Sequence, residues 1–459
     1  MFANNRLLSA ALISAVAAST AALVTPNNAE SSELPFLTSK TPYAAPTSQD
    51  YSAPPEGYQI MMIQHIARHG SRGLSSADDD DLMLQLWQSA RENGALTPLG
   101  ERLGPEIEKV MAVHETIGYG QLSGLGEREH RETAERLVKR HRAFLEQAAR
   151  DGKRVSSSHS GRSRAAASGE AFFEGWLGLL PQYAELLDAP YADPEVVYFN
   201  DGDNAEAYDA YVDNEPRINA LLNALEEHPR TEQAVSETLL RLFNSEFVAQ
   251  LERGELTFVA AADDEDRLES AFDAMEALYG LYVIAPNLRD EAEIDFSPFI
   301  PEQHLAWFAY IDDAGSFYER GPSLADSDMT YRNAAAAVSA MIDNIQLAVD
   351  NERPYAGDFR FTHAQALMPL AAFLGIEGAS QGVTVEHPYS YESNPWRASW
   401  VSPMAANVQW EAFSDRSGDV IVRMLHNEKE AAFSDSCKAL PDYPYYYELD
   451  ELSRCLLGN

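Results

Sequence analysis

Two arginines and a histidine follow a short apolar run near the N-terminal end of the chain. Residues 60–63 are Ile-Met-Met-Ile, and the pentapeptide Arg68-His69-Gly70-Ser71-Arg72 comes shortly after them. A guanidinium is a planar fork of donors that suits the oxygens of a phosphate group. A neutral imidazole held against that phosphate can attack phosphorus and become a phosphohistidine. The pentapeptide therefore predicts phosphoryl transfer to His69.

The neighbouring residues predict where this group lies in a fold. An apolar run that is bounded by a glycine indicates a buried strand that ends in a loop. In open α/β sheets, ligands bind just beyond the carboxyl ends of such strands. We therefore expect the pentapeptide at the substrate-binding edge of a sheet.

Two further segments repeat this pattern of a strand that delivers polar residues. Residues 155–158 can end a strand before a helix that starts near residue 165, and Arg162 and Arg164 lie at the turn between them. Residues 359–362 form a second short β-like run, which delivers His363. All three segments are expected at one edge of the sheet.

These motifs, in this order, resemble the histidine phosphatase superfamily in its acid phosphatase and phytase branch. The resemblance is strongest to the multiple inositol polyphosphate phosphatases, and it extends from about residue 58 to residue 440. It implies that His69 is the nucleophile and that Arg68 and Arg72 clamp the phosphate. Arg164 corresponds to the third clamp, with Arg162 as the alternative. His363 corresponds to the second histidine, which contacts the transferring phosphoryl group.

One position departs from the family pattern. Gln365 stands where relatives carry the residue that donates a proton, and an amide cannot protonate a leaving alkoxide. Gln365 and Arg162 are then expected to bind substrate. A carboxyl of the loop after the pentapeptide is the candidate donor, and Asp80 and Asp81 are the best placed because an apolar helix follows them.

The resemblance implies an exported phosphomonoesterase that acts on inositol polyphosphates such as phytate. The alternative is a binding protein for phosphorylated ligands that kept the arginines and lost efficient chemistry. The intact His69 favours the enzyme. A metal site built from His65 and His69 is not expected, because the segment is not helical and lacks the glutamate of an HExxH motif. We expect no metal and no cofactor.

The expected fold is an α/β core with a large helical insertion. The predicted parts are a signal peptide at 1–24, a flexible lead-in rich in Ser, Thr and Pro at 25–57, a catalytic core at 58–190 and 346–459, and a helical cap at 191–345. Within the core, residues 124–150 have the pattern of an amphipathic helix. His130 and His141 are expected on its surface.

Several features predict a secreted or periplasmic protein. Arg6 is followed by an apolar run rich in small residues over 7–24, which is typical of a cleavable signal peptide. No later stretch is long and apolar enough to span a bilayer. The chain has two cysteines, Cys437 and Cys455, and their spacing permits a disulfide in an oxidising compartment.

The charge balance limits the possible partners. The formal net charge is -38, which argues against nucleic acid as a ligand. The expected partner is a small phosphate ester. The active site must then be a basic island on an acidic protein.

Overall fold

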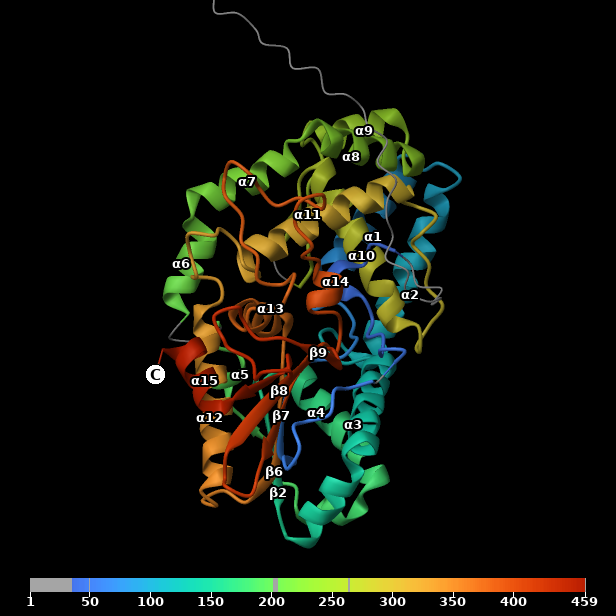
Figure 1. Ribbon diagram of the computed structural model, residues 1–459. Helices are drawn as coiled ribbons and strands as arrows, with labels where there is room; N and C mark the ends of the chain where they lie inside the picture. The colour runs from blue at the N-terminus through green and yellow to red at the C-terminus, as the bar shows by residue number, and fades with distance from the viewer. Residues whose placement is uncertain (1–34, 49, 201–204, 263–264, 459) are drawn as a thin grey trace, which may run out of the picture. The chain divides into compact units, whose positions relative to one another are not determined.

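The computed structural model describes residues 35–48, 50–200, 205–262 and 265–458 (Figure 1). The predicted signal peptide lies outside these residues. Among the residues that are described, no helix combines the length and the apolar composition needed to cross a membrane.

One mixed sheet forms the centre of the fold. Its strand order is β10-β8-β7-β1-β6-β2-β3, and β9 pairs with β8. Strands β1, β6, β2 and β3 run parallel, whereas β7, β8 and β10 are antiparallel to their neighbours. The strands are β1 (Gln59–Arg68), β2 (Arg154–His159), β3 (Tyr191–Ala192), β6 (Tyr355–Thr362), β7 (Asn407–Ser414), β8 (Val420–His426), β9 (Lys429–Ala431) and β10 (Tyr446–Glu448), with a separate hairpin of β4 (Phe258–Val259) and β5 (Arg267–Leu268).

Helices account for most of the remaining described chain. The α-helices are α1 (Asp78–Glu92), α2 (Leu103–Ile117), α3 (Gly124–Arg150), α4 (Ser163–Leu179), α5 (Pro194–Val197), α6 (Glu206–Asn214), α7 (Pro216–Glu226), α8 (Pro229–Leu242), α9 (Ser245–Glu252), α10 (Ala271–Ile284), α11 (Glu302–Arg320), α12 (Ala335–Val349), α13 (Ala364–Phe373), α14 (Ala398–Val401) and α15 (Leu449–Leu452). Short 3₁₀ or π turns are η1 (Thr38–Lys40), η2 (Gly100–Arg102), η3 (Pro181–Glu185), η4 (Ala285–Leu288), η5 (Arg332–Ala334) and η6 (Ser453–Leu457).

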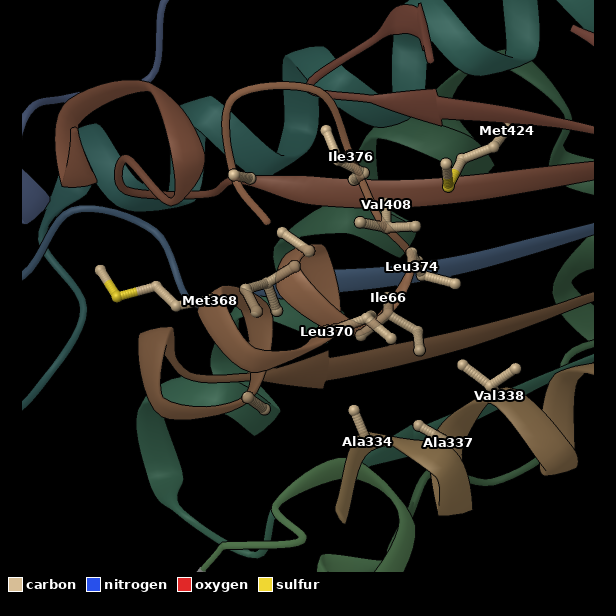
Figure 2. Packing of buried hydrophobic residues seen from close by; sticks show 14 of the residues in the cluster. Ile66, Ala334, Ala337, Val338, Met368, Leu370, Leu374, Ile376, Val408 and Met424 are labelled. Atoms are coloured by element: carbon tan, nitrogen blue, oxygen red, sulfur yellow. The ribbon is translucent and has the colours of Figure 1, made fainter. Parts of the chain in front are cut away.

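Strand β1 lies between two apolar layers. Its side chains alternate, so Met62 and Ile66 enter one layer while Ile63 and Ala67 enter the other. The first layer packs against α12 and α13, where Figure 2 shows Ile66 near side chains of both helices. The second layer packs against α3 and α4. A strand that is buried on both faces explains the continuous apolar run in the sequence.

The α/β fold with a helical insertion is confirmed. Helices α5 to α12 connect β3 to β6, as the predicted insertion does. The packing differs from the predicted boundaries at two places. Helix α1, which falls within the predicted core, packs against α10 of the insertion (Figure 1). Helix α12, most of which falls within the predicted insertion, contributes Val338 and Met341 to the core beside β1.

The described part of the predicted flexible lead-in is packed into the fold. Leu37, Thr38 and Ser39 are buried, so this segment differs from the mobile linker that its composition predicts. Its backbone carbonyls accept hydrogen bonds from distant parts of the chain. The bonds are Tyr282 Oη to Pro35 O at 2.7 Å, Tyr279 Oη to Phe36 O at 2.8 Å, Asn287 Nδ2 to Lys40 O at 2.9 Å and Met404 N to Thr41 O at 2.9 Å.

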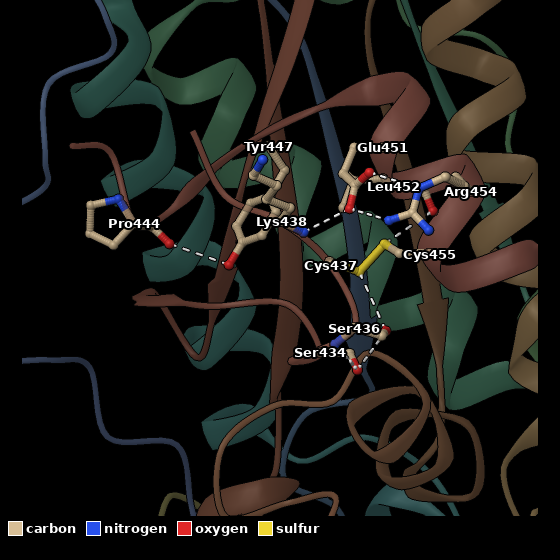
Figure 3. The surroundings of a disulfide bond; sticks show 10 residues. All are labelled: Ser434, Ser436, Cys437, Lys438, Pro444, Tyr447, Glu451, Leu452, Arg454 and Cys455. Atoms are coloured by element: carbon tan, nitrogen blue, oxygen red, sulfur yellow. Dashed lines mark hydrogen bonds and ion pairs between the residues drawn. A yellow bond between two sulfur atoms is a disulfide. The ribbon is translucent and has the colours of Figure 1, made fainter. Parts of the chain in front are cut away.

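The disulfide expected from the cysteine spacing is present. Cys437 and Cys455 are bonded, which ties the C-terminal turn to the loop after β9 (Figure 3). A second link lies beside the disulfide, because the Lys438 amide donates to a Glu451 carboxylate oxygen at 2.7 Å.

Candidate active site

The register of two parallel strands brings two histidines together. Arg68 of β1 pairs with Thr362 of β6, so His69 and His363 are the next residues on adjacent strands. The amide of His69 donates to the carbonyl of Thr362 at 2.8 Å. The ring centroids of the two histidines lie 5.2 Å apart, and the side chains are 2% and 0% exposed. Both rings therefore lie at the carboxyl edge of the sheet, as predicted for ligand-binding residues.

Hydrogen bonding selects one tautomer of His69. Its Nδ1 lies 2.9 Å from the carbonyl oxygen of Gly70, so Nδ1 carries the proton and donates it. The lone pair is then on Nε2. Burial, followed by the charges of Arg68 and Arg72, lowers the pKa of His69 well below 6.5. His69 is thus a neutral imidazole with a free Nε2 lone pair, which is the form a nucleophile requires.

Two backbone carbonyls hold the Arg68 side chain in place. Its Nη1 donates to the carbonyls of Ser39 at 2.6 Å and Ser402 at 2.5 Å, and the side chain is 1% exposed. Its Nε has no hydrogen-bond partner among the described residues. Burial and the charges of Arg72 and Arg164 lower the pKa of Arg68 to about 9. A buried cation with an unused donor indicates a place for an anion.

Arg72 and Arg164, the other two predicted clamps, also have a buried Nε without a hydrogen-bond partner in the described chain. Arg72 donates from Nη1 to the carbonyl of Gly73 at 2.6 Å, whereas its Nε is buried without a partner in the described chain. The Nε of Arg164 is buried in the same way. Burial, and then the charge of Arg164, lowers the pKa of Arg72 to about 10. Three guanidiniums therefore repel one another around His69, and a bound phosphate dianion would relieve that repulsion.

His363 is held by a hydroxyl and an aromatic ring. Its Nε2 lies 2.7 Å from Ser160 Oγ, and the Tyr198 ring lies 4.5 Å from it, centroid to centroid. The Nδ1 atom of His363 is buried and has no hydrogen-bond partner among the described residues. Burial, followed by the charge of Arg164, lowers the pKa of His363 to about 2. His363 is therefore a neutral imidazole with one ring nitrogen available to a ligand.

The loop that carries Arg72 is fixed by a buried carboxylate. Glu129 accepts hydrogen bonds from the amide of Ser71 at 2.7 Å, from its hydroxyl at 2.9 Å and from the amide of Tyr43 at 2.8 Å. Gly70 lies against the N-terminal turn of α3, where an added Cβ would be 2.5 Å from the carbonyl oxygen of Gly126. The glycine of the pentapeptide is therefore required by a close backbone approach.

Two other predicted residues lie at the rim of this group. Arg162 is exposed at the N-terminus of α4, whereas Arg164 is half-buried beside the phosphate clamps. This difference in exposure favours Arg164 over Arg162 as the third phosphate clamp. Gln365 is half-buried in the first turn of α13, two residues after His363.

The two candidate proton donors do not join this group. Asp80 is buried, where it accepts the Tyr119 hydroxyl at 2.8 Å and lies 3.4 Å from His114 Nδ1. Asp81 accepts the backbone amide of Ala261 at 2.7 Å. Both carboxylates fix the start of α1 against neighbouring segments, and neither contacts a predicted clamp.

The prediction that His130 and His141 lie on the surface is wrong. His130 is 1% exposed and packs edge-on against Phe361 of β6. His141 lies 2.7 Å from a carboxylate oxygen of Glu411 on β7. Both lie on α3, which extends along the sheet, so its polar face also meets neighbouring strands. No group of three His, Cys, Asp or Glu suited to a metal ion occurs within the described ranges.

Lys40 and Ser39 were not predicted from the sequence. The Ser39 carbonyl accepts a hydrogen bond from Arg68. Burial, followed by the charges of Arg72 and Arg68, lowers the pKa of Lys40 well below 10.5. Their segment is rich in Ser, Thr and Pro, and it carries no periodicity that would have indicated burial.

The comparisons with known proteins agree with this geometry. A family model described as "Histidine phosphatase superfamily (branch 2)" matches residues 59–427. The chain therefore belongs to the histidine phosphatase superfamily, branch 2, and it is an enzyme of the histidine acid phosphatase and phytase class. No curated protein sequence matches the chain.

Solved structures show how far the likeness extends. The multiple inositol polyphosphate phosphatase of Bifidobacterium longum, in complex with inositol hexasulfate, is 30% identical, with a TM-score of 0.86 over 92% of this chain and 97% of that chain. The phytase from D. castellii is 13% identical, with a TM-score of 0.60 over 92% of this chain and 84% of that chain. The Hafnia alvei phytase in complex with tartrate is 15% identical, with a TM-score of 0.53 over 88% of this chain and 98% of that chain. The last two share the fold.

Proposed function

We propose that this chain is an exported phosphomonoesterase that hydrolyses inositol polyphosphates such as phytate through a phosphohistidine at residue 69. The observation that carries the proposal is the hydrogen bond from His69 Nδ1 to the carbonyl of Gly70 at 2.9 Å. It leaves the Nε2 lone pair free in a buried site that three guanidiniums surround. This combination suits attack on a phosphate group.

Each residue of the group has a role in the proposed reaction. The Nε2 atom of His69 attacks phosphorus as the bond to the ester oxygen breaks. Arg68, Arg72 and Arg164 bind the phosphoryl oxygens, whose charge they stabilise in the transition state. In the tautomer that carries its proton on Nδ1, His363 donates a hydrogen bond to the same group. Water then attacks phosphorus, the bond to His69 breaks, and phosphate leaves.

The proposed substrate and the proposed location rest on separate observations. The similar phosphatase from Bifidobacterium longum was solved with inositol hexasulfate and with phosphate, which supports an inositol polyphosphate as the ester. The disulfide between Cys437 and Cys455 suits an oxidising compartment, which supports export. The alternative, a binding protein without chemistry, is disfavoured because the chain belongs to a family of enzymes.

A trapping experiment tests the proposal. The enzyme is mixed with phytate, quenched within milliseconds and assayed for an acid-labile, base-stable phosphoenzyme, while released phosphate gives turnover. His69→Ala should abolish both signals. His387→Ala, at an exposed histidine, is the matched control and should retain both. Undiminished turnover by His69→Ala would exclude the mechanism.

A further inference from the structure

A carboxylate, an imidazole and a phenol lie together beside the loop that follows Arg72, and the proposed reaction uses none of them. Asp80 accepts the Tyr119 hydroxyl at 2.8 Å, and the Tyr119 ring stacks on His114 with centroids 4.3 Å apart. The Nδ1 atom of His114 lies 3.4 Å from Asp80 Oδ2. Asp80 and His114 are 0% and 2% exposed. Because burying ionisable groups costs free energy, we expect this cluster to have a role in the fold or in the reaction.

A contact with the backbone fixes the tautomer of His114. The amide of Leu74 donates to His114 Nε2 at 2.9 Å. A backbone amide can only donate, so Nε2 is the acceptor and the proton of the neutral imidazole is on Nδ1. That nitrogen lies on the side of Asp80, whose carboxylate favours this tautomer and this orientation of the ring. Asp80 thus holds His114 with its lone pair toward the loop.

The amide of Leu74 belongs to the same peptide group as the carbonyl of Gly73. That carbonyl accepts Arg72 Nη1 at 2.6 Å. In a trans peptide the N–H and the C=O point in opposite directions, so His114 and Arg72 hold the two ends of one planar unit. Rotation of this unit away from His114 would also turn the carbonyl away from Arg72. The orientation of the Arg72 guanidinium therefore depends on His114.

Glycine at residue 73 makes this arrangement possible and also leaves the peptide group easy to rotate. A Cβ added to Gly73 would collide with His114 Nε2, so the imidazole reaches the amide only beside a glycine. Glycine also limits backbone rotation less than any other residue does. Two other backbone bonds, Gly73 N to Gln121 O at 3.3 Å and Gly120 N to Leu74 O at 2.6 Å, hold the flanking peptide groups and not this one. Orienting the central peptide group is thus left to the imidazole.

We propose that Asp80 and His114 are positioning residues for the phosphate clamp Arg72. They hold the peptide group of Gly73 and Leu74, whose carbonyl orients the guanidinium. This inference rests on the function proposed above, in which Arg72 binds the phosphoryl oxygens. The side chain of Arg72 is buried and its Nε has no partner among the described residues, so its position decides what that donor can reach. Misplacing such a group by about 1 Å can cost about 100-fold in rate.

Two substitutions at residue 114 separate the acceptor from the packing of the ring. His114→Gln keeps an acceptor, Oε1, close to the position of Nε2, whereas His114→Leu removes it. With p-nitrophenyl phosphate as substrate, His114→Leu should lower kcat/KM about 10–100-fold and raise the inhibition constant of inorganic phosphate by a similar factor. His114→Gln should restore most of both. Asp80→Ala should change both constants in the same direction as His114→Leu.

His304→Leu is the matched control, because it removes another buried imidazole. His304 of α11 is 6% exposed and lies 2.9 Å from Thr238 Oγ1 of α8. The urea midpoint of this variant should fall, as that of His114→Leu should, because each loses a buried contact. Its kcat/KM and its inhibition constant for phosphate should match the wild type. A loss of stability is thereby separated from a loss of phosphate binding.

A double-mutant cycle tests whether His114 acts through Arg72. Arg72→Ala alone should lower kcat/KM about 10²–10³-fold, which leaves measurable turnover. In that background, His114→Leu should have little further effect, because the clamp that it positions is already absent.

Three outcomes would overturn the inference: losses that multiply in the double variant, wild-type inhibition by phosphate in His114→Leu, or equal losses in His114→Gln and His114→Leu. Each of them, in an enzyme that His69→Ala inactivates, leaves the phosphohistidine mechanism intact. Turnover that survives His69→Ala would instead contradict the proposed function itself.

Discussion

His69 and His363 lie side by side, with ring centroids 5.2 Å apart, because residue 68 of β1 is paired with residue 362 of β6. The pairing is backbone register in a parallel sheet. Shifting either strand by one residue would turn its side chains to the opposite face. The catalytic geometry is therefore set by the same hydrogen bonds that hold the centre of the sheet together.

Arg164 and Arg162 give a matched pair of substitutions. Arg164→Ala should lower kcat/KM for phytate by about 10²–10³-fold, because a buried donor to the transition-state charge is lost. Arg162→Ala should cost less, because Arg162 is exposed. Steady-state kinetics of both variants decides between them. A larger loss for Arg162→Ala would place the third clamp two residues earlier.

Gln365→Glu should speed the release of a poor leaving group. A carboxyl at position 365 would supply the acid that the resemblance to related phosphatases places there. The substitution should raise first-turnover alcohol release from glycerol 2-phosphate about tenfold at acidic pH, where the carboxyl is protonated, and should change the nitrophenolate burst from p-nitrophenyl phosphate much less. Gln365→Met, which has no proton to donate, is the control. An equal gain with Met would show that the amide merely obstructs the substrate.

Salt should change phytate turnover in two phases. The net charge of -38 repels a polyanion at long range, and the Debye length falls from about 30 Å at 0.01 M salt to about 8 Å at 0.15 M. The kcat/KM for phytate should therefore rise over this range and fall at higher salt, as the arginine contacts weaken. p-Nitrophenyl phosphate, with fewer charges, should respond less. If kcat/KM for phytate instead falls continuously from low salt upward, the positive charge of the pocket outweighs the negative surface in its effect on the substrate.

His65 should make the fold sensitive to acid. It is 1% exposed between Phe172 and Phe359, and burial lowers its pKa to about 3. The unfolded chain binds a proton near pH 6.5 and the folded chain does not, so stability is lost as pH falls from 6.5 toward 3. His65→Phe should escape this loss. Its free energy of unfolding in urea, relative to wild type, should increase by about 1.4 kcal/mol per pH unit below 6.5. A difference that does not vary with pH would contradict this assignment.

The disulfide should contribute measurably to stability. The bond closes a loop with a sequence separation of 18 residues, for which the chain-entropy model gives about 3 kcal/mol. Replacing Cys437 and Cys455 by Ser should lower the free energy of unfolding by about 3 kcal/mol. A reducing agent should have the same effect on the wild type and none on the variant. An unchanged midpoint in both experiments would mean that the Lys438–Glu451 contact is sufficient.

The sequence predicts the sheet edge of the site well, and for a physical reason. Arg68 to Arg72 and His363 each follow a short apolar run, and a strand buried on both faces leaves such a run in the sequence. The helical insertion is likewise indicated by local periodicity. These features depend on residues that are close together in the sequence, so a single sequence is enough to predict them.

The rest depends on contacts between distant residues. Lys40 lies in a segment whose composition is typical of a linker, and its burial is due to partners such as Tyr279, Tyr282 and Asn287. His130 and His141 lie on a highly charged helix, and strands from later in the chain cover them. The contacts of Asp80 with Tyr119 and His114 could not be predicted either, because a run of four aspartates gives no sign of which one is buried.

The tethering of Ser39 and Lys40 constrains when the enzyme becomes active during its synthesis. The guanidinium of Arg68 is held between the carbonyls of Ser39 and Ser402, which lie near opposite ends of the chain. A growing chain therefore has no complete phosphate clamp until residue 402 has left the ribosome or the export channel. If the chain is exported as proposed, a chain that is still crossing the membrane would lack the complete clamp and would spare cellular phosphate esters.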